Sequence, residues 1–153
     1  MGNGVFNISK GLWRYYLGLP ATNDALVVVL LKSTGLVADS ALADYDDLTA
    51  LLAGASDEAD FTGYARKSIT SGITITVDDP NDRVDGDIPD QVWSTAGGAT
   101  NNTLGKLIVC YDPDTTGGTD ADLIPLTFHD FTATTDGNPL TAQVATAGLV
   151  RAA

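Results

Sequence analysis

The sequence has few cations and few of the residues that usually mark a reaction centre. It contains 8 Lys and Arg against 20 acidic residues, one His and one Cys. One cysteine cannot form a disulfide within the chain, and Cys110 lies in an apolar run, which predicts a buried, inert thiol. The formal charge of −12 argues against a nucleic-acid partner, because phosphate binding needs clustered Lys and Arg.

Long hydrophobic stretches are also missing. The longest apolar run covers residues 25–31, whereas a membrane span needs about 20 residues, so we expect no membrane partner. The N-terminal residues lack the apolar core of a secretion signal, which predicts a protein made and kept inside a cell.

Aspartate is abundant, and its placement indicates turns. Among the acidic residues only Glu58 is a glutamate, and most Asp residues stand beside Gly, Pro, Asn or Thr. Asp side chains accept hydrogen bonds from nearby backbone N–H groups, which favours turns and helix caps. Two segments, residues 78–90 and 112–122, concentrate the acid without a nucleophile beside a base. We therefore expect architectural carboxylates and no enzyme.

The length and the apolar pattern predict one domain with two helical regions. A chain of this length buries roughly 70% of its surface on folding, so residues 1–153 are expected to fold together without disulfide, metal or cofactor. Apolar side chains at helical spacing in residues 7–18 predict a short helix, and residues 1–20 are either that helix or an N-terminal arm. Residues 38–53 form the predicted amphipathic helix, ended by Gly54.

Strands are predicted for most of the remaining chain. Residues 25–31 are consecutive apolar residues rich in Val, which is typical of a strand buried on both faces. From residue 63 on, apolar and polar residues alternate, which is typical of half-buried strands. The predicted strands are residues 63–70, 73–77, 83–88, 91–94, 103–111, 123–132 and 140–150. The fold class is therefore α+β, with a mainly antiparallel sheet or sandwich after the helices.

Residues 112–122 partly match a calcium-binding loop. Acids stand at positions one and three of an EF-hand pattern and Gly117 at position six, but Leu123 takes position twelve, where a bidentate Glu is required. The candidate ligands are Asp112, Asp114, Asp120 and Asp122. A calcium-dependent or carbohydrate-binding β-module therefore stays open beside a simple strand connection.

His129, the single histidine, lies among alternating aromatic residues. It predicts a hydrogen-bonded strand histidine at a sheet edge, because one imidazole cannot form a metal site alone and no G-x-S-x-G sequence is present. An Asp-based hydrolase using Asp112 and Asp114 is the enzymatic alternative.

Several segments resemble small structural proteins of tailed bacteriophage particles. They are VFNISKG (5–11), YARK (64–67), DPNDR (79–83), IPDQVW (88–93), VCYD (109–112) and IPLTFHDF (124–131). The likeness spans nearly the whole chain. It is greatest to capsid decoration (cement) proteins, and it implies no catalytic residues.

The resemblance implies a protein made in the host cytoplasm and bound to the outer surface of the phage head. Its expected partners are the major capsid protein and copies of itself, and a neck or tail structural protein is the alternative. Because chain ends are free to reach outward, we expect apolar and aromatic side chains near the termini to make these contacts. The candidates are Phe6, Trp13, Tyr15, Tyr16, Leu149 and Val150. For the three aromatic residues 13, 15 and 16, core packing is the alternative to an anchor on a partner.

Overall fold

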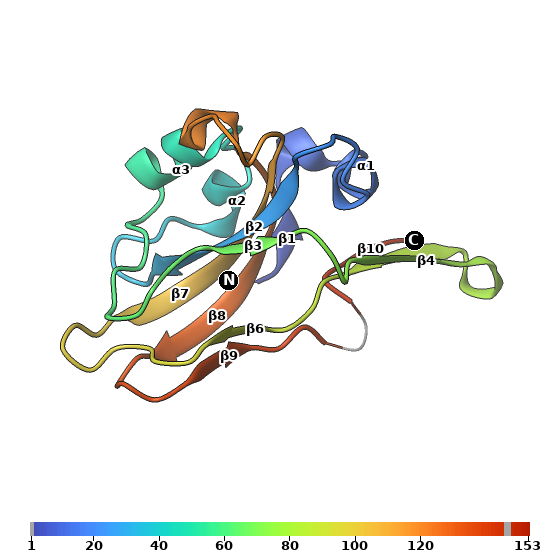
Figure 1. Cartoon of the computed structure of the whole chain (residues 1–153). Helices are drawn as coiled ribbons and strands as arrows, with labels where there is room; N and C mark the ends of the chain where they lie inside the picture. The colour runs from blue at the N-terminus through green and yellow to red at the C-terminus, as the bar shows by residue number, and fades with distance from the viewer. Residues whose placement is uncertain (1, 146–147) are drawn as a thin grey trace.

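A five-stranded antiparallel sheet forms the body of the protein. The computed structural model describes residues 2–145 and 148–153 (Figure 1). The body strands are β1 (Gly4–Val5), β2 (Ala25–Lys32), β3 (Lys67–Ile69), β7 (Thr103–Asp112) and β8 (Ile124–Thr134). Their order is β1-β8-β7-β2-β3, and every neighbouring pair is antiparallel. The predicted α+β class with mainly antiparallel strands is confirmed.

The core lies on both faces of this sheet, with β2 near its centre. The apolar run that predicted a fully buried strand is confirmed, because residues 25–31 are all buried. Leu26, Val28 and Leu30 face one apolar cluster, and Val27, Val29 and Leu31 face the other. Cys110 of β7 is buried in the second cluster, as predicted, and burial raises the pKa of its thiol.

The predicted helix over residues 38–53 is wrong as a single element. The structure has two short helices, α2 (Asp39–Leu42) and α3 (Leu48–Gly54), on one face of the sheet (Figure 1). Asp47 has an extended backbone, and its side chain accepts a hydrogen bond from the Ala50 N–H at 2.7 Å, which caps α3 and ends helical continuity. The apolar spacing of residues 38–53 suits both short helices, so it concealed the break.

The N-terminal segment is helical but packed onto the body. It contains the 3₁₀ turn η1 (Asn7–Ser9) and the helix α1 (Trp13–Leu17) in place of one helix over residues 7–18. Gly11 between them has a φ of +81°, which interrupts the helix. β1 pairs with β8, so this end of the chain is fixed to the sheet.

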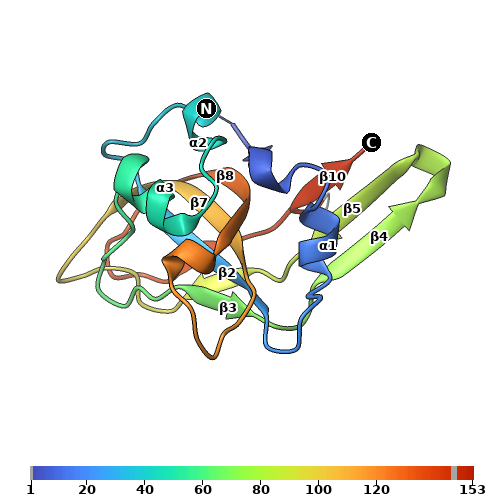
Figure 2. The ribbon, with the colours of Figure 1, turned by 90° about the horizontal axis from the view of Figure 1, so that it is seen from above.

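A second sheet projects from the body, and we call it the arm. Its strands are β4 (Thr74–Asp78), β5 (Arg83–Asp87) and β10 (Val150–Ala152), in the order β10-β5-β4. The 3₁₀ turn η2 (Asp79–Asn81) joins β4 to β5, which confirms the hairpin predicted from the DDPNDR turn. Figures 1 and 2 show the hairpin extending away from the five-stranded sheet, with the C-terminal strand along its root.

The remaining strands form a two-stranded ribbon. β6 (Gln91–Trp93) pairs with β9 (Leu140–Ala142), and the 3₁₀ turn η3 (Asp120–Asp122) precedes β8. The strand predicted over residues 63–70 is shortened to β3, because residues 62–63 form a turn in which Gly63 has a φ of +85°. The strand predicted over residues 140–150 is wrong as one element, because its two ends join different sheets as β9 and β10. Residues 146–147 of that prediction lie outside the described residues.

Candidate functional site

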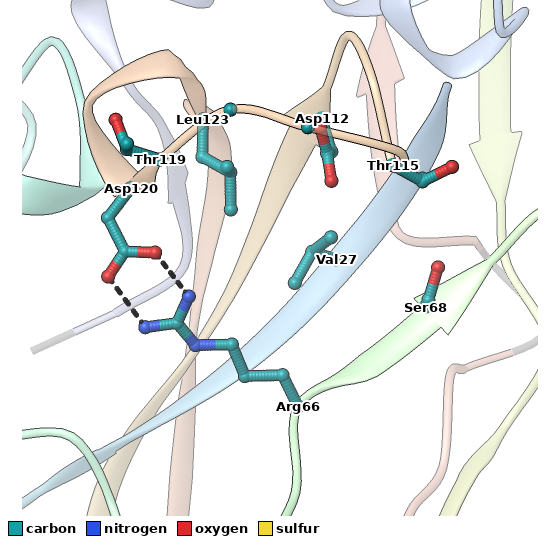
Figure 3. Close-up of a pocket in the computed structure, with 10 residues that line it drawn as sticks. Val27, Arg66, Ser68, Asp112, Thr115, Thr119, Asp120 and Leu123 are labelled. Carbon is teal, nitrogen blue, oxygen red and sulfur yellow. Dashed lines mark hydrogen bonds and ion pairs between the residues drawn. The ribbon is translucent and has the colours of Figure 1, made fainter. Parts of the chain in front are cut away.

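A hollow of about 330 Å³ lies between the edge of the sheet and the loop that follows β7 (Figure 3). Val27 of β2 and Leu123 supply its apolar lining, and Ser68 of β3 lies at its side. Arg66 reaches across it from the segment before β3 to Asp120 of η3. Arg66 and Asp120, which are 54 residues apart in the chain, meet at this hollow.

Arg66 fastens the loop to the body. Its Nε and Nη2 donate to Glu58 at 2.8 and 2.7 Å, and its Nη1 and Nη2 donate to Asp120 at 2.5 and 2.8 Å. A guanidinium has about five N–H donors, so two carboxylates occupy most of its capacity. Hydrogen bonds from Arg66 hold the pKa of Asp120 below its usual value. The arrangement is a structural clamp and offers little to an anionic ligand.

The other carboxylates of the 112–122 loop are engaged in turns. Asp112 accepts from the backbone N–H of Asp114 at 3.0 Å, and Asp114 accepts from that of Thr116 at 3.0 Å. Asp122 accepts from the backbone N–H of Thr119 at 2.7 Å. In the described part of the chain, no three His, Cys, Asp or Glu side chains are grouped so that they could hold a metal ion. The loop therefore gives no support to the calcium alternative.

Lys106 forms a buried ion network that the sequence did not reveal. Its side chain is 0% exposed, and Nζ lies 2.6 Å from Asp130 Oδ1 and 2.8 Å from Asp39 Oδ1. Nζ donates hydrogen bonds to the Gly2 carbonyl at 2.5 Å and to Asp130, and it forms an ion pair with Asp39. The network joins β7 to β8, to the start of α2 and to the N-terminal segment. A lysine among apolar strand residues was the only sequence signal for it.

His129 and Cys110 lie on opposite faces of the sheet. His129 stands opposite Leu107, whose side chain belongs to the apolar cluster on one face, whereas Cys110 belongs to the cluster on the other. His129 Nε2 is 2.9 Å from Thr127 Oγ1, so its hydrogen bond is to a neighbour on the same strand. Burial and the Lys106 charge lower the pKa of His129 to about 4. The two side chains cannot act as a nucleophile and base pair.

Most of the predicted terminal contact residues are not available to a partner. Phe6 is 0% exposed and packs edge-on against Phe128, with ring centroids 5.3 Å apart. Trp13 and Val150 are also buried, because both pack around Gly86 at the root of the arm. For these three residues the expectation of surface contact is corrected: β1 and β10 tie the termini into sheets, so their apolar side chains complete the core.

Of the other candidates, Tyr15 is the one that stands well out of the surface. Its exposed fraction is 62%, whereas Tyr16 is partly buried and its ring lies 4.7 Å from that of Tyr111. Leu149 is partly buried against the core. The prediction missed Ile8 and Leu12, which are 37% and 46% exposed. We call the three exposed apolar residues of this segment, Ile8, Leu12 and Tyr15, the N-terminal strip.

Comparisons with protein-family models, curated proteins and solved structures found no match to this chain. None of the helices formed by residues 2–145 and 148–153 has the length and hydropathy of a membrane span.

Proposed function

We propose that this chain is a non-enzymatic structural protein of a tailed phage particle. It binds the outer surface of the head and stabilises the capsid lattice. The resemblance of its sequence segments to virion proteins supports this role. The observation that carries the proposal is the N-terminal strip, because it exposes large apolar side chains on the least acidic part of the protein.

The charge distribution along the sequence sets the N-terminal segment apart from the rest of the chain. Residues 1–23 contain Lys10 and Arg14 and no acidic residue, whereas residues 24–153 hold all 20 acids and the other six cations. A cationic segment with exposed apolar side chains suits an acidic or apolar patch on a partner. The acidic remainder disfavours contact with DNA. This polarity is suited to a protein that binds the outside of a DNA-filled shell.

A small contact strip is sufficient for this role because the same contact is repeated many times on a capsid. Each contact of a few side chains is weak, but a shell presents the same site many times, and copies that also contact each other bind with higher effective affinity. Every copy that binds the assembled lattice better than free capsid subunits stabilises the lattice by linkage. We therefore expect a mechanical role that needs no reactive group.

The direct test of the proposal is the copy number in purified particles. Quantitative mass spectrometry should find this chain in numbers comparable to the major capsid protein. A small ring of copies would assign it to the neck or tail and overturn the head location. Absence from mature particles would overturn the structural role altogether.

A matched pair of variants tests the strip. Leu12 and Val92 are both 46% exposed, and Val92 lies on β6, outside the strip. Leu12→Asp should lower capsid occupancy about tenfold, because it places a charge in an apolar contact, whereas Val92→Asp should leave occupancy unchanged. Equal occupancy for both variants would show that the strip is not the contact.

A further inference from the structure

The arm has one apolar and one polar face. Residues directly opposite each other in antiparallel strands lie on the same face. The apolar set is formed by Ile75 with Gly86 and Val150, and by Val77 with Val84 and Ala152. The polar set includes Thr76, Asp85 and Arg151, which also lie side by side. The arm is therefore built like a half-buried sheet.

Only the root of the apolar face is covered. Trp13 and Leu17 of α1 lie so close to Gly86 that an added Cβ would be 2.9 and 2.5 Å from their side chains. One residue pair further out, Val77 is 54% exposed, although it lies on the same face as Ile75. The apolar face thus continues beyond the helix that covers it.

The outer edge of β4 has no partner strand in the described part of the chain. β4 pairs with β5 alone, in an uninterrupted register from Thr74 to Asp78. Exposed edges in monomeric proteins are commonly protected by Lys, Pro or a bulge. β4 has none of these within its five residues. Its N–H and C=O groups are arranged to accept another strand.

The charge of the arm strands permits a like copy to approach. β4, β5 and β10 contain three Asp and two Arg, a net charge of −1 in a chain of −12. Arg83 lies 3.0 Å from Asp78 and 3.0 Å from Asp85, and Arg151 also pairs with Asp85. Asp78 and Asp85 are thereby paired with arginine, which lowers the repulsion between the strands of two copies.

We propose that β4 pairs with β4 of a second copy, antiparallel, about a two-fold axis at Thr76. This register pairs all five residues and keeps the apolar faces of both copies on the same side. Ile75 then stands opposite Val77 of the other copy, and Thr74 stands opposite Asp78, so no like charges face each other. The product is a continuous six-stranded sheet, β10-β5-β4-β4-β5-β10.

The pairing also covers the exposed part of each apolar face. Val77 of one copy lies beside Ile75 of the other, where α1 approaches the sheet. Next to Ile75, a hollow of about 260 Å³ is lined by Leu17, Leu19 and Ile73 among others. The pairing therefore brings Val77 of one copy beside an apolar hollow of the other.

This inference does not depend on the proposed function. It uses the arm, whereas binding to the capsid is assigned to the N-terminal strip. A variant that blocks dimerisation in solution can still bind capsids, and a strip variant can still dimerise.

Cysteine cross-linking of the full chain tests the register. Thr76 and Asp79 are exposed, and the native Cys110 is buried and will not compete. Opposite residues have Cα atoms about 4.5–5.5 Å apart, which suits a disulfide. Two copies of residue 79 would be separated by six residue steps, about 20 Å. Under mild oxidation Thr76→Cys should give at least about tenfold more covalent dimer than Asp79→Cys.

Two results would overturn the proposal. One is a folded Thr76→Cys variant that remains monomeric at concentrations where wild type dimerises, or a wild type that never dimerises. The other is equal cross-linking by Asp79→Cys. A disulfide between residue 76 and a cysteine of another phage protein, without self-linking, would assign the edge to that protein instead.

Charge variants at the axis provide a second test. Thr76→Lys and Thr76→Glu each place like charges opposite each other, so each variant alone should be monomeric in sedimentation experiments. An equal mixture should recover the dimer, because the Lys and Glu side chains then face each other. A position away from the axis has no such self-complementarity, so failure of the mixture to dimerise would contradict this register.

Discussion

The body and the arm are both antiparallel sheets, but they differ in how their faces are covered. In the body, residues 25–31 of β2 are buried, with side chains packed on both faces. In the arm, no residue of β4 is fully buried, and the one fully buried residue of β5 is Gly86. The body is therefore covered on both faces by the chain itself, whereas the apolar face of the arm is covered by α1 only at its root.

This difference follows from the residue patterns. A run of apolar residues needs material on both sides of the sheet, and the helices and the N-terminal segment supply it. Alternating residues need material on one side only. A partner molecule would therefore bury more apolar surface on the arm than on the body.

The largest expected effect concerns acid and is confined to the body. Burial lowers the pKa of His129 to about 4, whereas an unfolded histidine titrates near 6.5. Between these pH values the unfolded chain binds more protons, so stability is full above pH 6.5 and falls as pH drops toward 4. The expected loss is about 3 kcal/mol in the free energy of unfolding.

Denaturant unfolding across this pH range measures the effect. His129→Gln keeps a polar side chain of similar size and removes the titration, so its stability should be nearly flat over that interval. Equal slopes for wild type and variant would show that His129 is not responsible.

Features set by residues close together in the sequence were predicted, whereas contacts between residues far apart in the sequence were not. The buried strand and the hairpin were predicted because seven apolar residues and an Asp-Pro-Asn turn act locally. The break at Asp47 was missed, since the same apolar spacing suits one helix or two. Arg66 and Asp120 are 54 positions apart, and Lys106 and Asp130 are 24 positions apart. No local pattern specifies such pairs. Burial of Phe6 was missed for the same reason.

The same substitution, Val→Ala, made in both sheets tests whether a valine side chain contributes more to stability in the body than in the arm. Val29→Ala in β2 should cost about 2 kcal/mol, because it removes buried methyl groups and leaves a cavity. Val77→Ala in β4 should change the free energy of unfolding of the monomer by less than about 0.5 kcal/mol. Chemical denaturation at low protein concentration compares the two. Similar losses would mean that the arm is packed as tightly as the body.

A pair of arginines gives a smaller contrast. Arg66 and Arg83 have side chains 30% and 31% exposed, and each contacts two carboxylates. Arg66→Met should cost about 1–2 kcal/mol, since it frees the 112–122 loop, whereas Arg83→Met, within one hairpin, should cost less than about 1 kcal/mol. The midpoint of thermal unfolding reports both. A larger loss for Arg83→Met would reverse the assigned roles.

The smallest expected effect is that of calcium. The loop carboxylates already accept backbone hydrogen bonds or the Arg66 guanidinium, so calcium at millimolar concentration should not shift the thermal midpoint. Magnesium at the same concentration controls for ionic strength. A stabilisation specific to calcium would revive the binding-loop interpretation and would require these side chains to rearrange.

Hydrogen exchange at two protein concentrations tests the central contrast most directly. Amides of β7, in the middle of the body sheet, should be equally protected at low and high concentration. Amides on the outer edge of β4 should exchange freely in dilute protein and become protected as concentration rises, because the second copy then occupies that edge. Protection of β4 that is the same at every concentration, or absent at all of them, would contradict the account of the arm as an assembly surface.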